Sequence, residues 1–228
     1  MACEDDVKDI FQSADCVCFD VDCTVCTDET IDELAKTLGM GDEVSKITCS
    51  AMRGTMSYKE SMIESFNLIK PSQSDIRKFV AAHPVQLTPN IRELVTTLQE
   101  RRIPVYLISG SFVCLIENVA EVLNIPKENI FANRLLFYYH GEFAEFDETQ
   151  PTINTDGKAK VIQQLKDKHG YQRVVHIGDG VTDLKACPPA DAFIGFGGNQ
   201  IREKVKNGCH WFVEDIKELL SVLQHKDN

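Results

Sequence analysis

Short apolar segments rich in β-branched residues alternate with amphipathic helical patterns from about Leu87 to the end of the chain, and this alternation constrains the fold more than any other feature. It is typical of βαβ units built around a parallel sheet. The predicted strands are Cys16–Asp20, Pro104–Ser109, Val174–Gly178, Ala192–Gly195 and Trp211–Val213. The predicted helices run from Thr88 to Arg101, over Ser111–Leu123 and over Lys158–Lys168. The fold class is therefore α/β, with a Rossmann-like parallel sheet as its core.

Two segments interrupt this alternation. Residues 28–83 carry no strand signal but several helical patterns in succession, which predicts an all-helical insertion. A smaller insertion at about 135–146 has the pattern of a β-hairpin. We therefore predict an α/β core made of residues 1–27 and 84–228, with a helical cap over 28–83.

The length and the charge of the chain limit the classes of protein to which it can belong. At 228 residues it can bury a substantial core. The net charge of −11 argues against nucleic-acid binding, because such proteins usually carry basic patches that neutralise phosphates. No apolar run approaches the length of a membrane span, and the acidic start Met1–Asp6 is unlike a secretory signal. We expect a cytoplasmic protein with no nucleic-acid or membrane partner.

The chain has nine cysteines, an odd count without the spacing of a disulfide scaffold, and we expect them to be reduced. Cys16, Cys18, Cys23 and Cys26 form a cluster whose last two members make a Cys-x-x-Cys pair. A zinc or redox site is the less favoured interpretation, because no second pair of cysteine or histidine residues completes a tetrahedral set.

The segment Val17–Thr24 is an apolar run that contains two aspartates, Asp20 and Asp22, at its end. Because burying an unpaired carboxylate is costly, we expect the strand to deliver both acids to a ligand-binding edge of the sheet. A second strand is followed by Asp179 and Asp183 among glycines. Such carboxylates are the hard oxygen ligands that Mg²⁺ prefers. A solvated loop after the first strand is the alternative.

Two further positions suit an anion. Ser109 and Gly110 end a predicted strand just before a helix, where backbone N–H groups and a hydroxyl can bind phosphate. Lys158 lies in the first turn of a predicted helix, where the macrodipole disfavours a cation unless an anion is near. From the residues alone, an ordinary strand-to-helix turn and a solvated surface lysine stay open as alternatives.

The order of these features, an acidic pair, Ser-Gly, a lysine and a second acidic pair on an α/β core, resembles the haloacid dehalogenase superfamily of phosphohydrolases. Further segments narrow the resemblance to its animal-type phosphoserine phosphatase family, and they cover nearly the whole chain. These segments are Phe19–Asp22, Ile31–Lys36, Leu87–Pro89, Phe131–Leu135, Phe146–Pro151 and Ala186–Asn199.

The resemblance implies an aspartyl-phosphate mechanism in which Asp20 is the nucleophile and Asp22 is first the acid and then the base. It implies Mg²⁺ as the cofactor, held by Asp20, the backbone carbonyl of Asp22, Asp179 and, from nearby, Asp183. It implies phosphate binding by Ser109, Gly110 and Lys158. The substrate-binding residues that it implies are Glu29, Met52, Arg53, Tyr58, Ser111, Thr182 and Arg202.

In this family the reaction is hydrolysis of O-phospho-L-serine to L-serine and phosphate, the last step of serine biosynthesis. The resemblance alone suggests a homodimer, and it places the ammonium of the substrate at Glu29. Two alternatives stay open: the same chemistry on a different small phosphomonoester, and a catalytically weak regulatory relative.

Three positions depart from the family pattern. Ser65 stands where relatives carry a cap arginine that pairs with the substrate carboxylate, and a hydroxyl cannot replace a bidentate guanidinium. Arg53 and Ser111 each stand where relatives usually have glycine. We hypothesise that Arg53 supplies the missing carboxylate contact; the alternative is an arginine that points to solvent.

Overall fold

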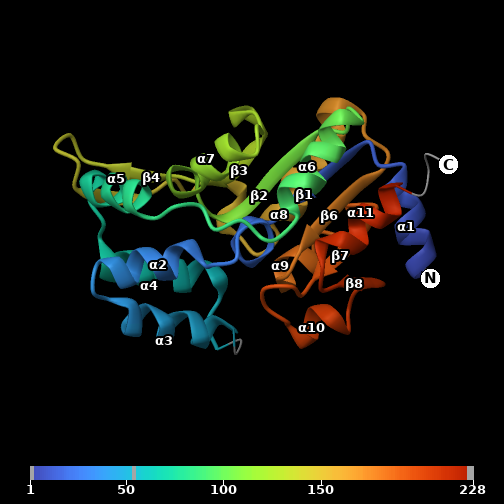
Figure 1. Ribbon diagram of the computed structural model, residues 1–228. Helices are drawn as coiled ribbons and strands as arrows, with labels where there is room; N and C mark the ends of the chain where they lie inside the picture. The colour runs from blue at the N-terminus through green and yellow to red at the C-terminus, as the bar shows by residue number, and fades with distance from the viewer. Residues whose placement is uncertain (1–2, 53–54, 225–228) are drawn as a thin grey trace.

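The computed structural model describes residues 3–52 and 55–224, and a six-stranded sheet in the order β3-β2-β1-β6-β7-β8 runs through its centre (Figure 1). All neighbouring strands of this sheet are parallel. The strands are β1 (Cys16–Phe19), β2 (Val105–Phe112), β3 (Ile130–Asn133), β6 (Val174–Gly178), β7 (Ala192–Phe196) and β8 (Trp211–Val213). The predicted α/β class with a parallel sheet is confirmed.

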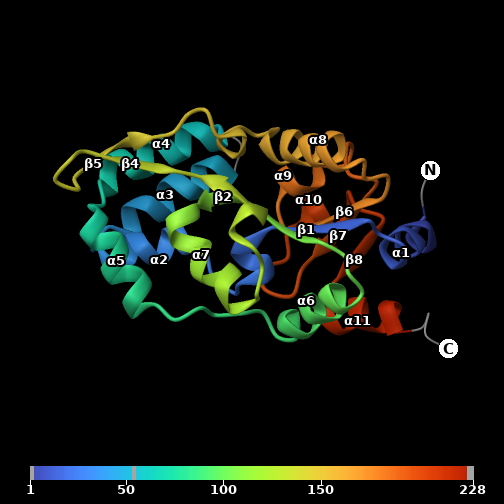
Figure 2. The ribbon, with the colours of Figure 1, turned by 90° about the horizontal axis from the view of Figure 1, so that it is seen from above.

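Helices cover both faces of the sheet, which explains why β1, β6 and β7 are buried along their whole length. Figure 2 shows α8 and α9 on one side and α6 and α11 on the other. The apolar residues of α8 pack with Cys16, Cys18 and Ile108, whereas α1, α6, α7 and α11 share the larger core on the opposite face. The helices are α1 (Glu4–Gln12), α6 (Ile91–Glu100), α7 (Val113–Val122), α8 (Gly157–His169), α9 (Val181–Leu184), α10 (Glu203–Lys206) and α11 (Ile216–Gln224).

The segment after β1 is helical, as its sequence pattern predicts, and lies at one end of the molecule (Figure 1). Its helices are α2 (Thr30–Thr37), α3 (Gly41–Met52), α4 (Tyr58–Ile69) and α5 (Gln73–Ala82). The predicted hairpin is present as β4 (Leu135–Phe137) and β5 (Phe143–Phe146), and it packs on α4 through Phe143 and Phe66, whose ring centroids are 6.1 Å apart.

Several boundaries differ from the sequence prediction. The helix predicted to start at Ser111 starts at Val113, because β2 continues to Phe112 through a register shift after Ile108. The helix predicted from Thr88 starts at Ile91, since Asn90 adopts a left-handed conformation with φ 66°. The pairing of β2 with β3, a strand that the sequence pattern did not predict, explains the first difference. Helices α1 and α11 were also not predicted.

The order of the strands reverses at β1. Strands β2 and β3, which follow β1 in the chain, lie on one side of it, and the later strands β6, β7 and β8 lie on the other side. Open α/β sheets bind ligands where the strand order reverses in this way. None of the described helices is long and apolar enough to cross a bilayer.

Candidate active site

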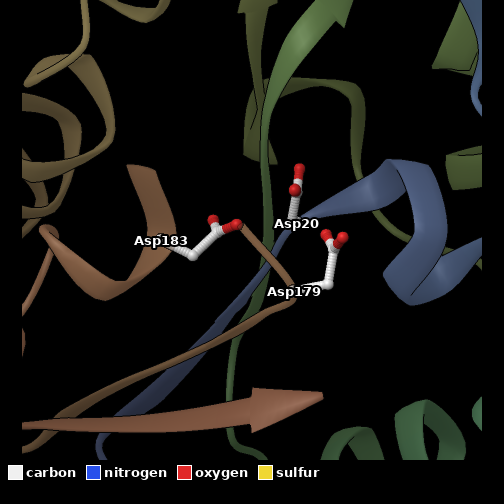
Figure 3. A group of neighbouring side chains, drawn as sticks. All are labelled: Asp20, Asp179 and Asp183. Atoms are coloured by element: carbon white, nitrogen blue, oxygen red, sulfur yellow. The ribbon is translucent and has the colours of Figure 1, made fainter. Parts of the chain in front are cut away.

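Three buried carboxylates meet at the carboxyl ends of β1 and β6 (Figure 3). Asp20 directly follows β1, Asp179 directly follows β6, and Asp183 lies on the short helix α9. Each offers an oxygen, and these three oxygens lie within 4.8 Å of one another. The two acidic strand ends that the sequence singled out therefore come together in space.

Lys158, the second residue of α8, lies among these carboxylates. Its Nζ is 2.8 Å from Asp20 Oδ1 and 2.6 Å from Asp183 Oδ1, and the residue is only 6% exposed. Burial disfavours the charge, but the carboxylates of Asp183 and Asp20 outweigh it and raise the pKa of Lys158 above its ordinary value. The alternative of a solvated surface lysine is excluded.

The three aspartates differ in the direction in which their surroundings shift the pKa of the carboxyl group. Burial, followed by the charge of Asp183, raises the pKa of Asp20 well above its ordinary value. Burial raises the pKa of Asp179 as well, although Arg202 opposes it. For Asp183 burial acts in the same direction, but Lys158 and His176 reverse the shift and lower its pKa. Asp183 is thus the carboxylate whose ionised form its neighbours favour most, whereas burial outweighs the cationic partners of Asp20 and Asp179.

Asp22 lies in the tight turn that follows β1, where Cys23 has a positive φ of 54°. Its Oδ1 accepts hydrogen bonds from the backbone N of Thr30, at 2.9 Å, and from the Thr30 hydroxyl. Burial and the nearby charge of Glu29 raise the pKa of Asp22 to about 7. A carboxyl group with this pKa can give and take a proton near neutral pH.

Arg202 links two acidic groups of the site. Its Nε donates to Asp179 Oδ2 at 2.6 Å, and its Nη2 donates to Glu29 Oε1 at 3.0 Å. Glu29 and Arg202 therefore lie beside Asp179. Thr182 is half-buried on α9, next to Asp183.

The segment Ser109–Ser111 forms the irregular end of β2. Ser109 Oγ accepts from the Ser111 backbone N at 2.9 Å, and the Gly110 carbonyl accepts from Tyr58 Oη and from Asn133 Nδ2, both at 2.7 Å. A Cβ at position 110 would lie 2.1 Å from Tyr58 Oη, so a larger residue there would displace the end of the Tyr58 side chain. The Ser111 hydroxyl is buried and has no hydrogen-bond partner in the part of the chain that the structure describes.

The remaining predicted substrate residues belong to the helical insertion. Tyr58 begins α4 and reaches Gly110 as described, and Met52 ends α3. Arg53 lies outside the described residues. Ser65 is 4% exposed on α4, on the same buried face as Met62 and Ile69.

Comparison with known proteins places this site in a family. A family model described as haloacid dehalogenase-like hydrolase matches residues 14–191. Phosphoserine phosphatase of Bos taurus is 52% identical over 224 residues, which are 98% of this chain and 100% of that protein. The chain belongs to the haloacid dehalogenase-like hydrolases. The chloroplastic phosphoserine phosphatase of Arabidopsis thaliana, 44% identical over 96% of this chain and 75% of its own length, is a more distant relative.

Solved structures have the same fold. A phosphoserine phosphohydrolase-like protein from Francisella tularensis superposes with a TM-score of 0.79 at 28% identity, covering 91% of this chain and 99% of that one. The structure described as DsGPDH of Dunaliella salina gives a TM-score of 0.86 at 33% identity, over 98% of this chain and 38% of that chain. The fold predicted from the resemblance is therefore confirmed.

The cysteines of this haloacid dehalogenase-like hydrolase are all free. Cys16 and Cys18 are buried in β1, and Cys23 and Cys26 are buried in the turn after it. Among the described residues, the cluster suited to a metal ion is the aspartate triad, which contains no cysteine. The zinc interpretation gains no support.

Sequence reasoning assigned no role to two polar residues that support this hydrolase site. Asn199 Nδ2 lies 3.1 Å from the Cys23 carbonyl, 3.2 Å from the Cys26 carbonyl and 2.7 Å from Thr88 Oγ1. His176 lies inside β6 and contacts Asp183. A histidine inside an apolar strand is a usable signal, because a buried polar side chain needs a partner. Asn199 lies in a loop, and its contacts depend on the tertiary fold alone.

Proposed function

We propose that this protein hydrolyses O-phospho-L-serine to L-serine and phosphate, the last step of serine biosynthesis. The observation that carries the proposal is the end-to-end match, 52% identical, to phosphoserine phosphatase of Bos taurus. The geometry supports it, because an aspartate, a buried lysine and a metal-competent acidic cluster lie together at the carboxyl edge of the sheet.

In the first step, Asp20 attacks phosphorus and the bond from phosphorus to the serine oxygen breaks. Val21 N and Lys158 Nζ both contact Oδ1 of Asp20, each at 2.8 Å, and these contacts orient the carboxylate. We assign the attack on phosphorus to the other carboxylate oxygen, Oδ2 of Asp20. Asp22 donates its proton to the leaving serine oxygen, and a pKa of about 7 suits this role.

In the second step, a water attacks the phosphorus of the aspartyl-phosphate and gives its proton to Asp22. The bond from phosphorus to Asp20 breaks, which releases phosphate and restores both aspartates to their starting states. Lys158 offers positive charge to the phosphoryl oxygens in both steps, and the Ser109 hydroxyl with the nearby backbone N–H groups offers further hydrogen bonds.

The residues present fit Mg²⁺. The acidic groups of the site are Asp20, Asp22, Glu29, Asp179 and Asp183, and the cations among them are Lys158 and Arg202. This excess of hard oxygen ligands suits a divalent cation. We assign its binding to Asp20, Asp179 and the Asp22 carbonyl, with Asp183 in support. When bound, Mg²⁺ supplies positive charge that offsets repulsion between carboxylate and phosphate.

We propose that residues 28–83 form a cap on a core of residues 1–27 and 84–228. The two connections lie side by side, since Cys26 and Leu87 form an isolated antiparallel bridge and Thr27 N donates to the Gln86 carbonyl at 2.9 Å. The Tyr58 contact with Gly110 joins the cap to the phosphate-binding segment. A cap held in this way excludes water until the alcohol has left.

A second candidate is a phosphomonoester that lacks the carboxylate of phosphoserine. Its support is Ser65, a buried neutral hydroxyl on α4 where the resemblance implies an arginine. Arg53 is the residue that we propose for carboxylate recognition, and the substrate ammonium is assigned to Glu29. The two candidates differ in whether the carboxylate contributes to binding.

The deciding experiment measures phosphate release from phosphoserine and from phosphoethanolamine, which keeps the ammonium and the phosphate but lacks the carboxylate. The primary proposal predicts a kcat/KM at least tenfold higher for phosphoserine, and the reverse preference would support the second candidate. If Arg53 binds the carboxylate of phosphoserine, Arg53→Ala should raise the KM for phosphoserine but not for phosphoethanolamine. No release from either substrate, nor from phosphothreonine or a sugar phosphate, would favour a regulatory relative.

A homodimer, which the family resemblance alone suggests, and a cytoplasmic location, which the sequence suggests, stay predictions. Binding of a small phosphorylated amino acid, without a nucleic-acid or membrane partner, is part of the same proposal. Sedimentation of the purified chain at several concentrations tests the dimer directly.

A further inference from the structure

The residue that the proposed mechanism leaves without a role is His176, in the middle of β6. It is fully buried, pairs with Cys18 of β1 and Phe193 of β7 across the sheet, and stands two residues before the end of its strand. A histidine at such a position needs a hydrogen-bond partner, because an unpaired polar group in a core is destabilising. The partner that it has is a carboxylate of the active site.

His176 Nε2 lies 2.7 Å from Asp183 Oδ1, the oxygen that also accepts from Lys158 Nζ at 2.6 Å. Asp183 Oδ2 accepts from the backbone N of Gly180 at 3.0 Å. Lys158 of α8, His176 of β6 and the backbone of Gly180, just before α9, thus hold one buried carboxylate, which Figure 3 shows turned toward Asp20 and Asp179. Lys158 Nζ, which contacts this carboxylate, also lies 2.8 Å from Asp20 Oδ1.

The same contacts assign the proton on the imidazole. An ionised carboxylate can only accept, so Nε2 must carry the proton that forms this hydrogen bond. Nδ1 is buried and has no hydrogen-bond partner among the residues that the structure describes. A proton on Nδ1 would be a buried donor without an acceptor, so the contacts favour a proton on Nε2 alone.

We propose that His176 is a positioning residue, which in its Nε2–H form fixes the Asp183 carboxylate and thereby holds Lys158 against Asp20. This inference rests on the proposed phosphatase function for its kinetic test. Without the Nε2 donor, Asp183 keeps two of its three hydrogen bonds and gains freedom to rotate. The expected consequence is a lower kcat with little change in KM, because His176 does not itself contact the substrate.

The test compares His176→Gln with His176→Met. Glutamine can place its amide N–H near the position of Nε2, and methionine has a similar length but no donor. Outer partners of active-site ligands typically contribute about 10- to 100-fold to activity or metal affinity, so His176→Met should lower kcat for phosphoserine by about that factor. His176→Gln should retain most of the wild-type kcat. His140→Met, at an exposed histidine on the hairpin, serves as the matched control.

Nitrogen-15 NMR of the histidine rings tests the same assignment without turnover, and the inference predicts a proton on Nε2 and none on Nδ1. A kcat of His176→Met within twofold of the wild type would overturn it. Equal losses in the glutamine and methionine variants would also overturn it, since packing alone would then explain the residue. If the wild-type chain releases no phosphate from phosphoserine, the proposed function fails, and the NMR result alone tests the role of His176. In that case a proton on Nε2 supports the inference, and a proton on Nδ1 overturns it.

Discussion

Asn199 holds the turn that follows β1 against the segment that follows the helical insertion, and its removal should destabilise the protein. Its Nδ2 lies within 3.2 Å of three acceptors: the Cys23 carbonyl, the Cys26 carbonyl and Thr88 Oγ1. An amide NH₂ has two hydrogens, so two full hydrogen bonds are lost in Asn199→Ala. At a net value of about 1 kcal/mol each, the free energy of unfolding should fall by about 2 kcal/mol.

Urea unfolding followed by circular dichroism measures this change as a shift of the midpoint at constant slope. Asn199→Asp has the same shape but puts an acceptor opposite two carbonyls, so it should be less stable than Asn199→Ala. Asn207→Ala, at an exposed asparagine, is the control and should change stability by less than about 0.5 kcal/mol. An Asn199→Ala midpoint equal to that of the control, or an aspartate variant as stable as the wild type, would refute this reasoning.

Three other predictions follow from the site and the core. A Cβ at Gly178 would lie 2.3 Å from Asp183 Cγ, so Gly178→Ala should displace that carboxylate and lower both activity and melting temperature. Removal of divalent cations with EDTA should abolish phosphate release, and Mg²⁺ should restore it; activity that persists in EDTA would contradict the metal assignment. Burial raises the pKa of the Cys114 thiol to about 11, so at pH 8 iodoacetamide should label the exposed Cys3 and Cys49 before Cys114. Mass spectrometry should show the labelling of Cys114 rise steeply toward pH 10, and equal labelling of the three thiols at pH 8 would contradict this.

The sequence pattern predicted the central strands because they are buried on both faces. Such strands appear as short apolar runs, and Val174–Gly178 and Trp211–Val213 have the predicted bounds. The edge strand β3 (Ile130–Asn133) was missed, since its two first residues are only partly buried and its pattern is weak. The end of β2 was also misplaced, because pairing with β3 determines where that strand stops.

Within the site, the motif order predicted which side chains come together, since parallel strands end at one edge of a sheet. It could not predict the contacts that depend on tertiary placement. The hydrogen bonds of Asp22 to Thr30, at the first residue of α2, depend on how the helical segment folds back. The contact of His176 with Asp183 depends on α9 turning back over β6. Residue type and spacing therefore indicate the chemistry, and the fold decides how each group is held.

The measurement that tests the central claim most directly is Mg²⁺-dependent release of phosphate from phosphoserine by the wild-type chain and by Asp20→Asn. Asparagine has nearly the same shape as aspartate but is a far weaker nucleophile, so the substituted protein can keep the fold without forming the aspartyl-phosphate. We predict turnover by the wild type and at least a thousandfold lower kcat for Asp20→Asn at an unchanged melting temperature. Equal rates for the two proteins, or no release by the wild type, would contradict the account.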